Sequence, residues 1–185
     1  MVVIYLHGFR SSPASQKGRI LRSAFATKET FLAPDLNCSP DEVQALLLDL
    51  IKGISPNDIC LVGSSLGGFY ATWLAEKIGC KAVLLNPATQ PWEVVGEHLG
   101  VQTIHGTDRT IEVKPEFEGQ MLSMAAKPTK PERYLVFLST DDEVLDWHKA
   151  QRQYADCEQV ILEGNNHQIE HFETCLARIE QFINS

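Results

Sequence analysis

The sequence predicts an α/β fold, a three-layer sandwich in which helices cover both faces of one open, largely parallel sheet. Six short apolar runs recur along the chain, helix-like stretches separate them, and Pro or Gly marks many of the junctions. A continuous run such as Val2–Leu6 is typical of a strand buried on both faces, as in a parallel sheet. A length of 185 residues fits one domain. With the strands numbered along the chain, we expect the order 2-1-3-4-5-6.

Local signals support the individual elements. Ser39 is placed to cap a helix, with Pro40 at its first position and Glu42 three residues after the cap. Gly79 is placed to end the helix that begins near Gly67. The expected strands are 2–6, 31–33, 59–62, 82–85, 134–138 and 160–162, and the expected helices are 15–26, 40–53, 67–78 and 171–183.

The alternation of strands and helices breaks once, at residues 87–131 between the fourth and fifth strands. A connection of this length inside a compact domain is usually functional or disordered, and its apolar content disfavours disorder. We therefore expect a small cap over the carboxyl edge of the sheet, within a single domain of residues 1–185. The apolar side chains of this segment include Trp92, Val94, Val95, Leu99, Phe117, Met121, Leu122 and Met124.

Charge and cysteine content exclude several classes of protein. Lys and Arg number 16 against 24 Asp and Glu, and the net charge of −8 argues against a nucleic-acid coat or a polybasic membrane binder. No apolar run approaches the length of a membrane span, and the first apolar stretch is too short for a signal peptide. The cysteines are odd in number and scattered, which favours a reduced, cytoplasmic protein. They are Cys38, Cys60, Cys80, Cys157 and Cys175.

The stretch Gly63-Ser64-Ser65-Leu66-Gly67 matches the pattern G-x-S-x-G. The pattern alone is weak, but here it leaves a buried strand and opens a helix, which is the sharp turn that exposes a nucleophilic serine. Ser65 is therefore the candidate nucleophile. The same turn places the backbone N–H of Leu66 at a helix N-terminus, where it can donate to an oxyanion. The alternatives are a purely structural strand–helix turn and a phosphate-binding loop.

A second candidate oxyanion donor follows the first strand, in His7-Gly8-Phe9. The first and third strands are neighbours in the expected order, so this loop lies beside the turn at Ser65. Gly8 allows the backbone N–H of Phe9 to turn toward the site. We expect His7 to be a buried structural histidine that is bonded to the backbone.

A catalytic serine needs a base and an orienting carboxylate, which follow it in the order Asp or Glu, then His, in sheets of this kind. His167 lies in the loop after the sixth strand and meets that order. The fifth strand is followed by Asp141, Asp142 and Asp146, and the spacing alone leaves the choice among them open. A histidine in a loop rich in Gly and Asn is often only a turn residue. A serine, an aspartate and a histidine nevertheless follow one another in the expected order at strand ends, and this favours a Ser-His-Asp catalytic triad.

Together these stretches resemble the YqiA-type esterases, small members of the α/β-hydrolase fold that lack its first strands. The resemblance covers nearly the whole chain and is most specific at the serine turn and at residues 142–146. It implies that Ser65 is the nucleophile, Asp142 the acid and His167 the base. The chain departs from the family's pattern at Asp141, where a small residue is expected. Other resembling stretches are His7-Gly8-Phe9, Ser11-Ser12-Pro13, Tyr70–Leu74, Asn86-Pro87-Ala88, Glu163-Gly164 and Asn166.

The leading hypothesis is a serine esterase or thioesterase that works through an acyl-enzyme, with the amides of Phe9 and Leu66 holding the oxyanion. It requires no cofactor. One alternative is a zinc hydrolase, because residues 167–171 match H-x-x-E-H, in which His167 and His171 would bind the metal. Another is a binding module that kept a hydrolase fold without catalysis.

The expected partner is a small-molecule acyl ester or thioester, with no nucleic acid and no membrane span. Trp92 and Met121 are candidates for contact with an acyl chain. The first thirty residues carry a net charge of +4, from five Lys and Arg against Glu29, which is commonly only a solvated helix face. The alternative, functional interpretation of this charge is that Arg10, beside the oxyanion loop, favours an anionic substrate such as an acyl thioester of a phosphate-bearing carrier.

Overall fold

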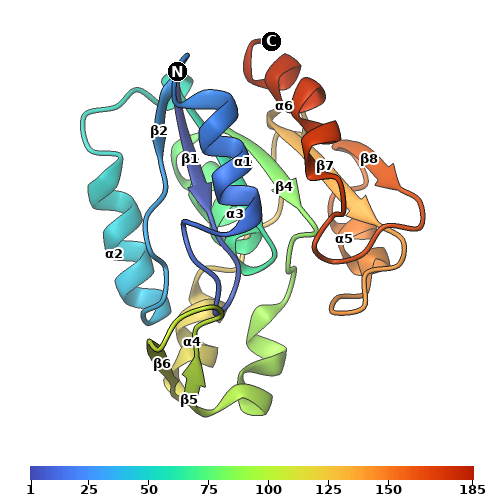
Figure 1. Cartoon of the computed structure of the whole chain (residues 1–185). Helices are drawn as coiled ribbons and strands as arrows, with labels where there is room; N and C mark the ends of the chain where they lie inside the picture. The colour runs from blue at the N-terminus through green and yellow to red at the C-terminus, as the bar shows by residue number, and fades with distance from the viewer.

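A computed structural model describes residues 1–185, which form a six-stranded sheet and a separate two-stranded sheet. Figure 1 shows helices packed around the larger sheet. The strand order is β2-β1-β3-β4-β7-β8, and every neighbouring pair is parallel. Because β7 and β8 correspond to the fifth and sixth predicted strands, the observed order confirms the predicted order 2-1-3-4-5-6. The strands are β1 (Val2–Leu6), β2 (Thr30–Leu32), β3 (Ile59–Ser64), β4 (Lys81–Leu85), β7 (Tyr134–Ser139) and β8 (Glu158–Leu162).

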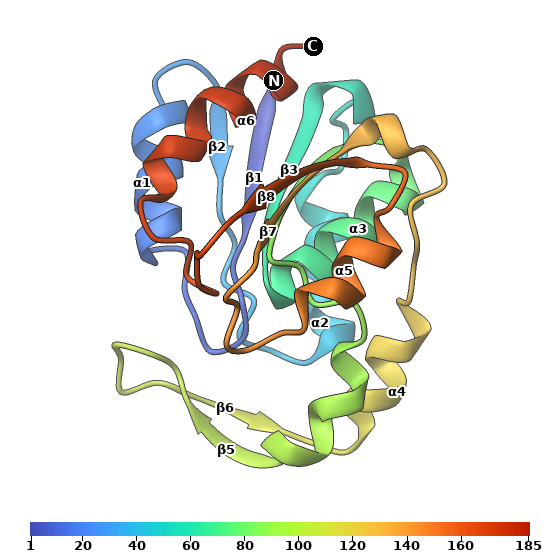
Figure 2. The ribbon, with the colours of Figure 1, turned by 90° about the vertical axis from the view of Figure 1, so that its right-hand side faces the viewer.

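Two hydrophobic cores lie on the two faces of the sheet, because successive side chains of a strand point to opposite faces. In β1, Ile4 packs into the core shared with Val43, whereas Val3 packs into the core shared with Leu21. Figure 2 shows the layers from the side. The first core lies under α2 (Pro40–Leu50), α3 (Leu66–Ile78) and α5 (Trp147–Gln153), and the second under α1 (Gln16–Phe25) and α6 (Leu176–Ile183).

The caps of the helices follow the local signals. Ser39 and Glu42 form a reciprocal capping box at the start of α2, with Pro40 in the first turn. Helix α2 ends at Leu50, earlier than predicted, and Gly79 ends α3 with a φ of 85°. The predicted last helix is split into η4 (Phe172–Cys175) and α6, and His171, which has a left-handed φ of 56°, precedes η4 and belongs to neither.

Residues 87–131, called the insert from here on, connect β4 to β7 and lie beyond the carboxyl ends of the strands (Figures 1 and 2). Val95, Val113, Phe117 and Met121 are buried and join the core beneath α2 and α3. No helix of the structure is long and apolar enough to cross a membrane. The insert contains η2 (Pro91–His98), the antiparallel pair β5 (Gly100–Thr103) and β6 (Thr110–Val113), and α4 (Glu116–Ser123), and it ends where η3 (Pro131–Arg133) begins.

Candidate active site

Ser65 is the single residue between β3 and α3, and the chain changes direction sharply there. Its φ of 54° and ψ of −119° lie in a region that residues with side chains rarely adopt. The turn also needs Gly63 and Gly67: a Cβ on Gly63 would collide with the backbone of Gly67, and one on Gly67 with the carbonyl of Leu6. The strained turn brings Ser65 to the wall of a pocket, where its hydroxyl makes no hydrogen bond.

Two free backbone N–H groups accompany this serine. The amides of Phe9 and Leu66 donate to no acceptor in the protein, and both residues line the same pocket as Ser65. A Cβ built on Gly8 would lie 3.2 Å from Cβ of Ser65 and 3.8 Å from its Oγ, so the loop after β1 packs directly against the serine. The two amides expected to hold an oxyanion are therefore unpaired and adjacent to Ser65.

His7 fixes the loop that carries one of these amides. Its Nε2 accepts the N–H of Leu36 at 2.9 Å, which leaves the ring proton on Nδ1, 2.8 Å from the carbonyl oxygen of Gly8. Burial lowers the pKa of His7 and keeps the ring neutral. The Gly8 carbonyl and the Phe9 N–H belong to one planar peptide unit. His7 is thus a buried structural histidine, as predicted, and it fixes the direction of the Phe9 N–H.

His167 and Asp142 form the central polar contact of the site. Nδ1 of His167 lies 2.8 Å from Oδ2 and 3.0 Å from Oδ1 of Asp142, and the aspartate side chain is only 1% exposed. Oδ1 also accepts the backbone N–H groups of Val144 and Leu145, at 2.9 and 2.8 Å. A carboxylate held in this way accepts a hydrogen bond from Nδ1–H, which keeps that proton on Nδ1 and leaves Nε2 of His167 free to accept another proton.

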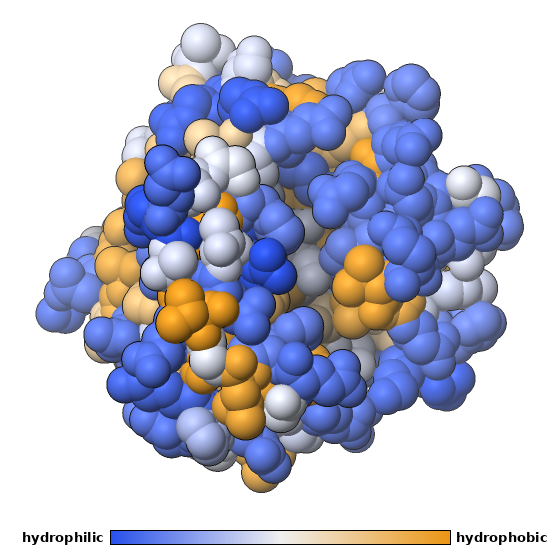
Figure 3. Space-filling model, turned by 60° about the horizontal axis from the view of Figure 1, so that its bottom comes forward, coloured by the Kyte–Doolittle hydropathy of each residue, from blue (hydrophilic) through white to orange (hydrophobic).

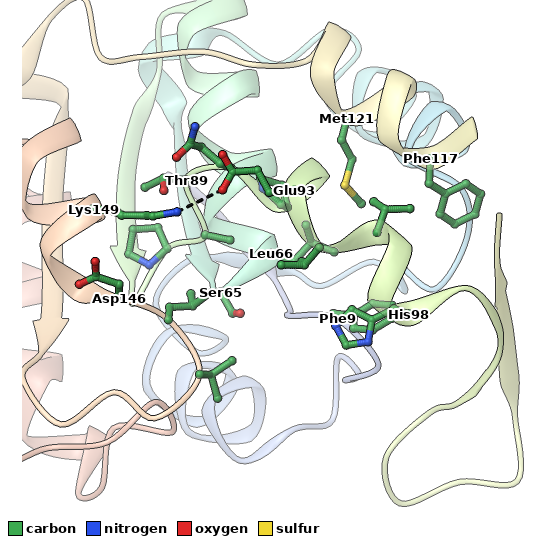
Figure 4. Close-up of a pocket in the computed structure, with 18 of the residues that line it drawn as sticks. Phe9, Ser65, Leu66, Thr89, Glu93, His98, Phe117, Met121, Asp146 and Lys149 are labelled. Atoms are coloured by element: carbon green, nitrogen blue, oxygen red, sulfur yellow. Dashed lines mark hydrogen bonds and ion pairs between the residues drawn. The ribbon is translucent and has the colours of Figure 1, made fainter. Parts of the chain in front are cut away.

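The other two candidate aspartates do not contact His167, although Asp146 lines the same pocket as Ser65 (Figure 4). Asp141 is exposed, and its side chain contacts only the hydroxyl of Thr140, at 3.4 Å. Asp146 caps α5 by accepting the backbone N–H of His148 at 3.0 Å. Of the three candidate aspartates, only Asp142 contacts the ring of His167.

Asn86 ties the histidine loop to the end of β4, a contact that sequence reasoning missed. Its amide nitrogen donates to Ser139 Oγ at 2.9 Å and to the carbonyls of Asn166 and His167 at 3.2 Å, while its oxygen accepts the N–H of Ser139. The available signal was Asn86 itself, a polar residue directly after a buried strand. The Glu143 carboxylate also holds the histidine loop, because it accepts the N–H of His167 at 3.0 Å. This hydrogen bond holds the pKa of Glu143 below its usual range.

Ser65 is anchored to the same end of β4. Its N–H donates to the carbonyl of Leu85, and its carbonyl accepts from Ala88, both at 3.0 Å. Ser65 and the His167 loop are therefore each bonded to residues 85–88. No hydrogen bond joins the Ser65 hydroxyl to His167 in this structure. Hydrogen bonds of this kind often tighten only when substrate binds.

The H-x-x-E-H stretch does not have the helical geometry that the zinc hypothesis requires. Residues 167–171 form turns, and both Ile169 and His171 have positive φ angles. His171 is exposed, whereas Nδ1 of His167 is engaged by Asp142. The two histidines thus do not share a helix face, and the premise of that alternative is wrong.

The pocket at Ser65 has a volume of about 240 Å³ and mostly apolar walls (Figure 4). On the face formed by the carboxyl ends of the strands, apolar residues border a hollow (Figure 3). Phe117 and Met121 of the insert line the pocket, as do Val144 and Leu145 beside Asp142, but His167 does not. Further lining residues are Pro87, Ala88, Val94, Val95, His98 and Val113.

Of the three candidate substrate-binding residues, only Met121 lines this pocket. Trp92 does not line it and packs against Phe69 in a T-shaped arrangement, with the ring centroids 6.0 Å apart. Arg10 is engaged by the insert, since its Nε donates to the carbonyl of Thr103 at 2.7 Å. The charge of Arg10 therefore does not face the pocket at Ser65, contrary to the interpretation that it selects the substrate there.

The sequence of the whole chain matches a known family. The uncharacterised protein family UPF0227 matches residues 2–184. The chain belongs to this family. A UPF0227 protein of Citrobacter koseri is 25% identical over 191 residues, covering 98% of both chains, and one of Vibrio atlanticus is 27% identical over 191 residues, covering all of both. The resemblance to the YqiA type is thereby confirmed at the level of the family.

Solved structures similar to this UPF0227 member share its architecture. Est1E from Butyrivibrio proteoclasticus superposes with a TM-score of 0.73 at 18% identity, covering 100% of this chain and 88% of Est1E. The carboxylesterase CesB from Bacillus subtilis gives a TM-score of 0.64 at 16% identity, covering 98% of this chain and 83% of CesB. At such identities the likeness confirms the α/β-hydrolase fold.

Proposed function

We propose that this protein is a serine hydrolase that cleaves carboxylic esters or thioesters. The observation that carries the proposal is the convergence at one sheet edge of Ser65, which has a strained backbone and a free hydroxyl, two unpaired amides beside it, and a His167 oriented by buried Asp142. The fold shared with CesB, which is named as a carboxylesterase, supports the same conclusion. Each of these groups matches one requirement of acyl transfer.

The proposed reaction begins with attack of Ser65 Oγ on the acyl carbonyl while Nε2 of His167 takes the hydroxyl proton. Asp142 keeps the other ring proton on Nδ1 and stabilises the resulting imidazolium. The amides of Phe9 and Leu66 donate to the oxyanion of the tetrahedral intermediate. His167 then protonates the leaving alcohol or thiol, and water, activated by the same histidine, releases the acid from Ser65.

The apolar pocket is the proposed site of the acyl group. Its walls include aliphatic and sulfur atoms of Leu66, Val95, Val113 and Met121. Binding of an apolar acyl chain against these atoms is favourable because the chain is removed from water. The volume of about 240 Å³ suits a short or medium acyl chain more than a long one. Substitution of Met121 by Trp should therefore reduce kcat/KM more for octanoyl than for acetyl esters.

Labelling with a fluorophosphonate tests the nucleophile directly. An activated serine attacks phosphorus far faster than an ordinary hydroxyl, so we expect one label per protein, mapped to Ser65 by peptide mass spectrometry. Ser65→Ala should abolish both labelling and the hydrolysis of p-nitrophenyl butyrate. Ser64→Ala is the matched control, because Ser64 is the buried last residue of β3.

The outcomes separate the proposal from its alternatives. Label on Ser64, or label that survives Ser65→Ala, would contradict the assignment of the nucleophile. A folded protein that neither reacts with the probe nor hydrolyses any ester would instead be a binding module.

A further inference from the structure

The turn that follows β1 contains a strained residue next to one of the two candidate oxyanion donors. The N–H of Ser11 donates to the carbonyl of Gly8 at 3.2 Å, so residues 8–11 form a β-turn with Phe9 and Arg10 at its centre. Arg10, the third residue of this turn, has a φ of 56°, a conformation that Gly or Asn normally supplies there. A residue with a longer side chain keeps such a φ only when its surroundings stabilise it. The turn therefore depends on contacts from outside.

The connection between β5 and β6 supplies these contacts. Nε of Arg10 donates to the carbonyl of Thr103 at 2.7 Å, and the carbonyl of Arg10 accepts the N–H of His105 at 2.8 Å. The side chain and the main chain of Arg10 are thus both held by the same short segment of the insert. We call residues 103–109 the clasp.

The clasp has a defined structure that does not depend on Arg10. The N–H of Thr107 donates to the carbonyl of Ile104 at 3.2 Å, and Gly106 has the positive φ, 72°, that the third residue of a type II turn requires. The N–H of Ile104 donates to the carbonyl of Arg109 at 2.9 Å, and Ile104 is only 1% exposed. At the far end of the clasp, Nη1 of Arg109 lies 2.7 Å from Oδ2 of Asp35. The clasp can therefore impose a conformation on Arg10.

The conformation of Arg10 in turn affects the direction of the Phe9 N–H. The carbonyl oxygen of Gly8 accepts two hydrogen bonds, from Nδ1 of His7 at 2.8 Å and from the N–H of Ser11 at 3.2 Å. This carbonyl and the Phe9 N–H belong to one planar peptide unit and point in opposite directions. If the turn opened, the bond from Ser11 would be lost, and only His7 would hold this peptide unit.

We propose that the clasp is a positioning element of the active site, which holds Arg10 in its left-handed conformation and so keeps the Phe9 N–H directed at the oxyanion. The inference rests on the proposed function and adds a role of the insert in the chemical step. None of residues 103–109 lines the pocket at Ser65. They act through Arg10 and its turn and do not touch the substrate. Loss of the clasp should therefore lower kcat and leave KM nearly unchanged.

Substitution of His105 tests the clasp without changing Arg10. His105 is exposed, its side chain forms no hydrogen bond or ion pair, and it is the second residue of its turn, where Pro is favoured. His105→Pro fits this turn and removes the N–H that the Arg10 carbonyl accepts. Full loss of an oxyanion donor costs about 10²–10³-fold in kcat, so a misdirected donor should cost about tenfold. We expect that loss for p-nitrophenyl butyrate, with KM within about twofold of the wild-type value.

The matched control is His105→Ala, which removes the same side chain but keeps the N–H. It should have the kcat and KM of the wild type. Equal kcat values for His105→Pro and His105→Ala would overturn the inference, as would a loss that appears in KM alone.

Substitution of Arg10 tests the clasp from the other side. Arg10→Ala removes the bond to Thr103 and should also lower kcat about tenfold with little change in KM. Arg19→Ala is the matched control, because the exposed Arg19 side chain also donates to a backbone carbonyl, that of Ala14, but within its own segment of the chain. Arg19→Ala removes the same charge and should keep the wild-type kcat.

Amide hydrogen exchange provides a readout that does not depend on activity. The Ser11 N–H is bonded to the Gly8 carbonyl, and its exchange should become at least about threefold faster in His105→Pro but not in His105→Ala. Unchanged exchange in His105→Pro, or faster exchange with the wild-type kcat, would overturn the inference while the proposed function stands. A wild-type protein that hydrolyses no ester would overturn the proposed function, and faster exchange in His105→Pro would then leave the clasp as a structural contact only.

Discussion

Replacing Asp142 by Asn should nearly abolish turnover while leaving the fold intact. Oδ1 of Asp142 accepts the N–H groups of Val144 and Leu145, so the oxygen of the new amide must occupy that position to keep both bonds. The amide NH₂ group then replaces Oδ2, the atom 2.8 Å from Nδ1 of His167. A donor at that place forces Nδ1 to accept and moves the ring proton to Nε2. In that tautomer the ring cannot take a proton from Ser65.

The magnitude follows from this change of tautomer. The equivalent substitution in a serine protease lowers kcat about 10⁴-fold, which corresponds to about 5 kcal/mol of activation free energy. Stability should change much less, because the asparagine side chain has nearly the same volume as the native aspartate and retains the two backbone bonds of Oδ1. We expect the Tm to fall by no more than a few degrees.

The assay is hydrolysis of p-nitrophenyl butyrate beside thermal unfolding of the same preparations. Asp141→Asn is the matched control, since Asp141 is the exposed neighbour and does not contact His167. It should keep most of the wild-type kcat. If Asp141→Asn were the inactive variant, or if Asp142→Asn turned over at a rate near that of the wild type, the assignment of the orienting carboxylate would be refuted.

Three further predictions test the caps, the buried charge and the metal hypothesis. Asp146→Ala removes the cap of α5 and should cost about 1 kcal/mol of stability, or about 2–4 °C in Tm, with most of the activity kept. Lys17 is 7% exposed, and burial lowers its pKa to about 8, so the unfolded state holds this proton more tightly. The free energy of unfolding should therefore gain a contribution from Lys17 that increases from about pH 8 toward pH 10, and urea titrations should find this contribution absent in Lys17→Met. EDTA should leave ester hydrolysis unchanged, and a loss that zinc restores would contradict the serine mechanism.

The sequence was sufficient to predict the sheet because each strand contains a run of apolar residues and helices separate most of these runs. β1, β3 and β4 lie within a residue or two of their predicted limits, and the turn at Ser65 occurs where two glycines make it possible. These features depend on local chemistry and on general rules of strand order. They do not require knowledge of which distant residues meet.

The parts that escaped prediction depend on distant contacts. β5 and β6 are four residues each, too short to stand out, and β5 is largely exposed, with Val101 69% exposed. Spacing could not separate Asp142 from its neighbours, because only the fold decides which carboxylate reaches His167; the family resemblance made that choice. The long side chain of Arg10 has many possible acceptors, and its bond to Thr103 depends on how the insert packs.

The insert is one continuous segment, and neither Ser65, Asp142 nor His167 belongs to it. These three residues follow β3, β7 and β8, whereas Val95, Val113, Phe117 and Met121 of the pocket wall all come from the insert. The groups proposed to carry out the chemistry and much of the pocket wall are therefore encoded in separate stretches of the gene. Exchange of residues 87–131 between relatives needs only two crossovers and replaces this part of the wall, so the shape of the pocket can change while the proposed catalytic residues stay the same.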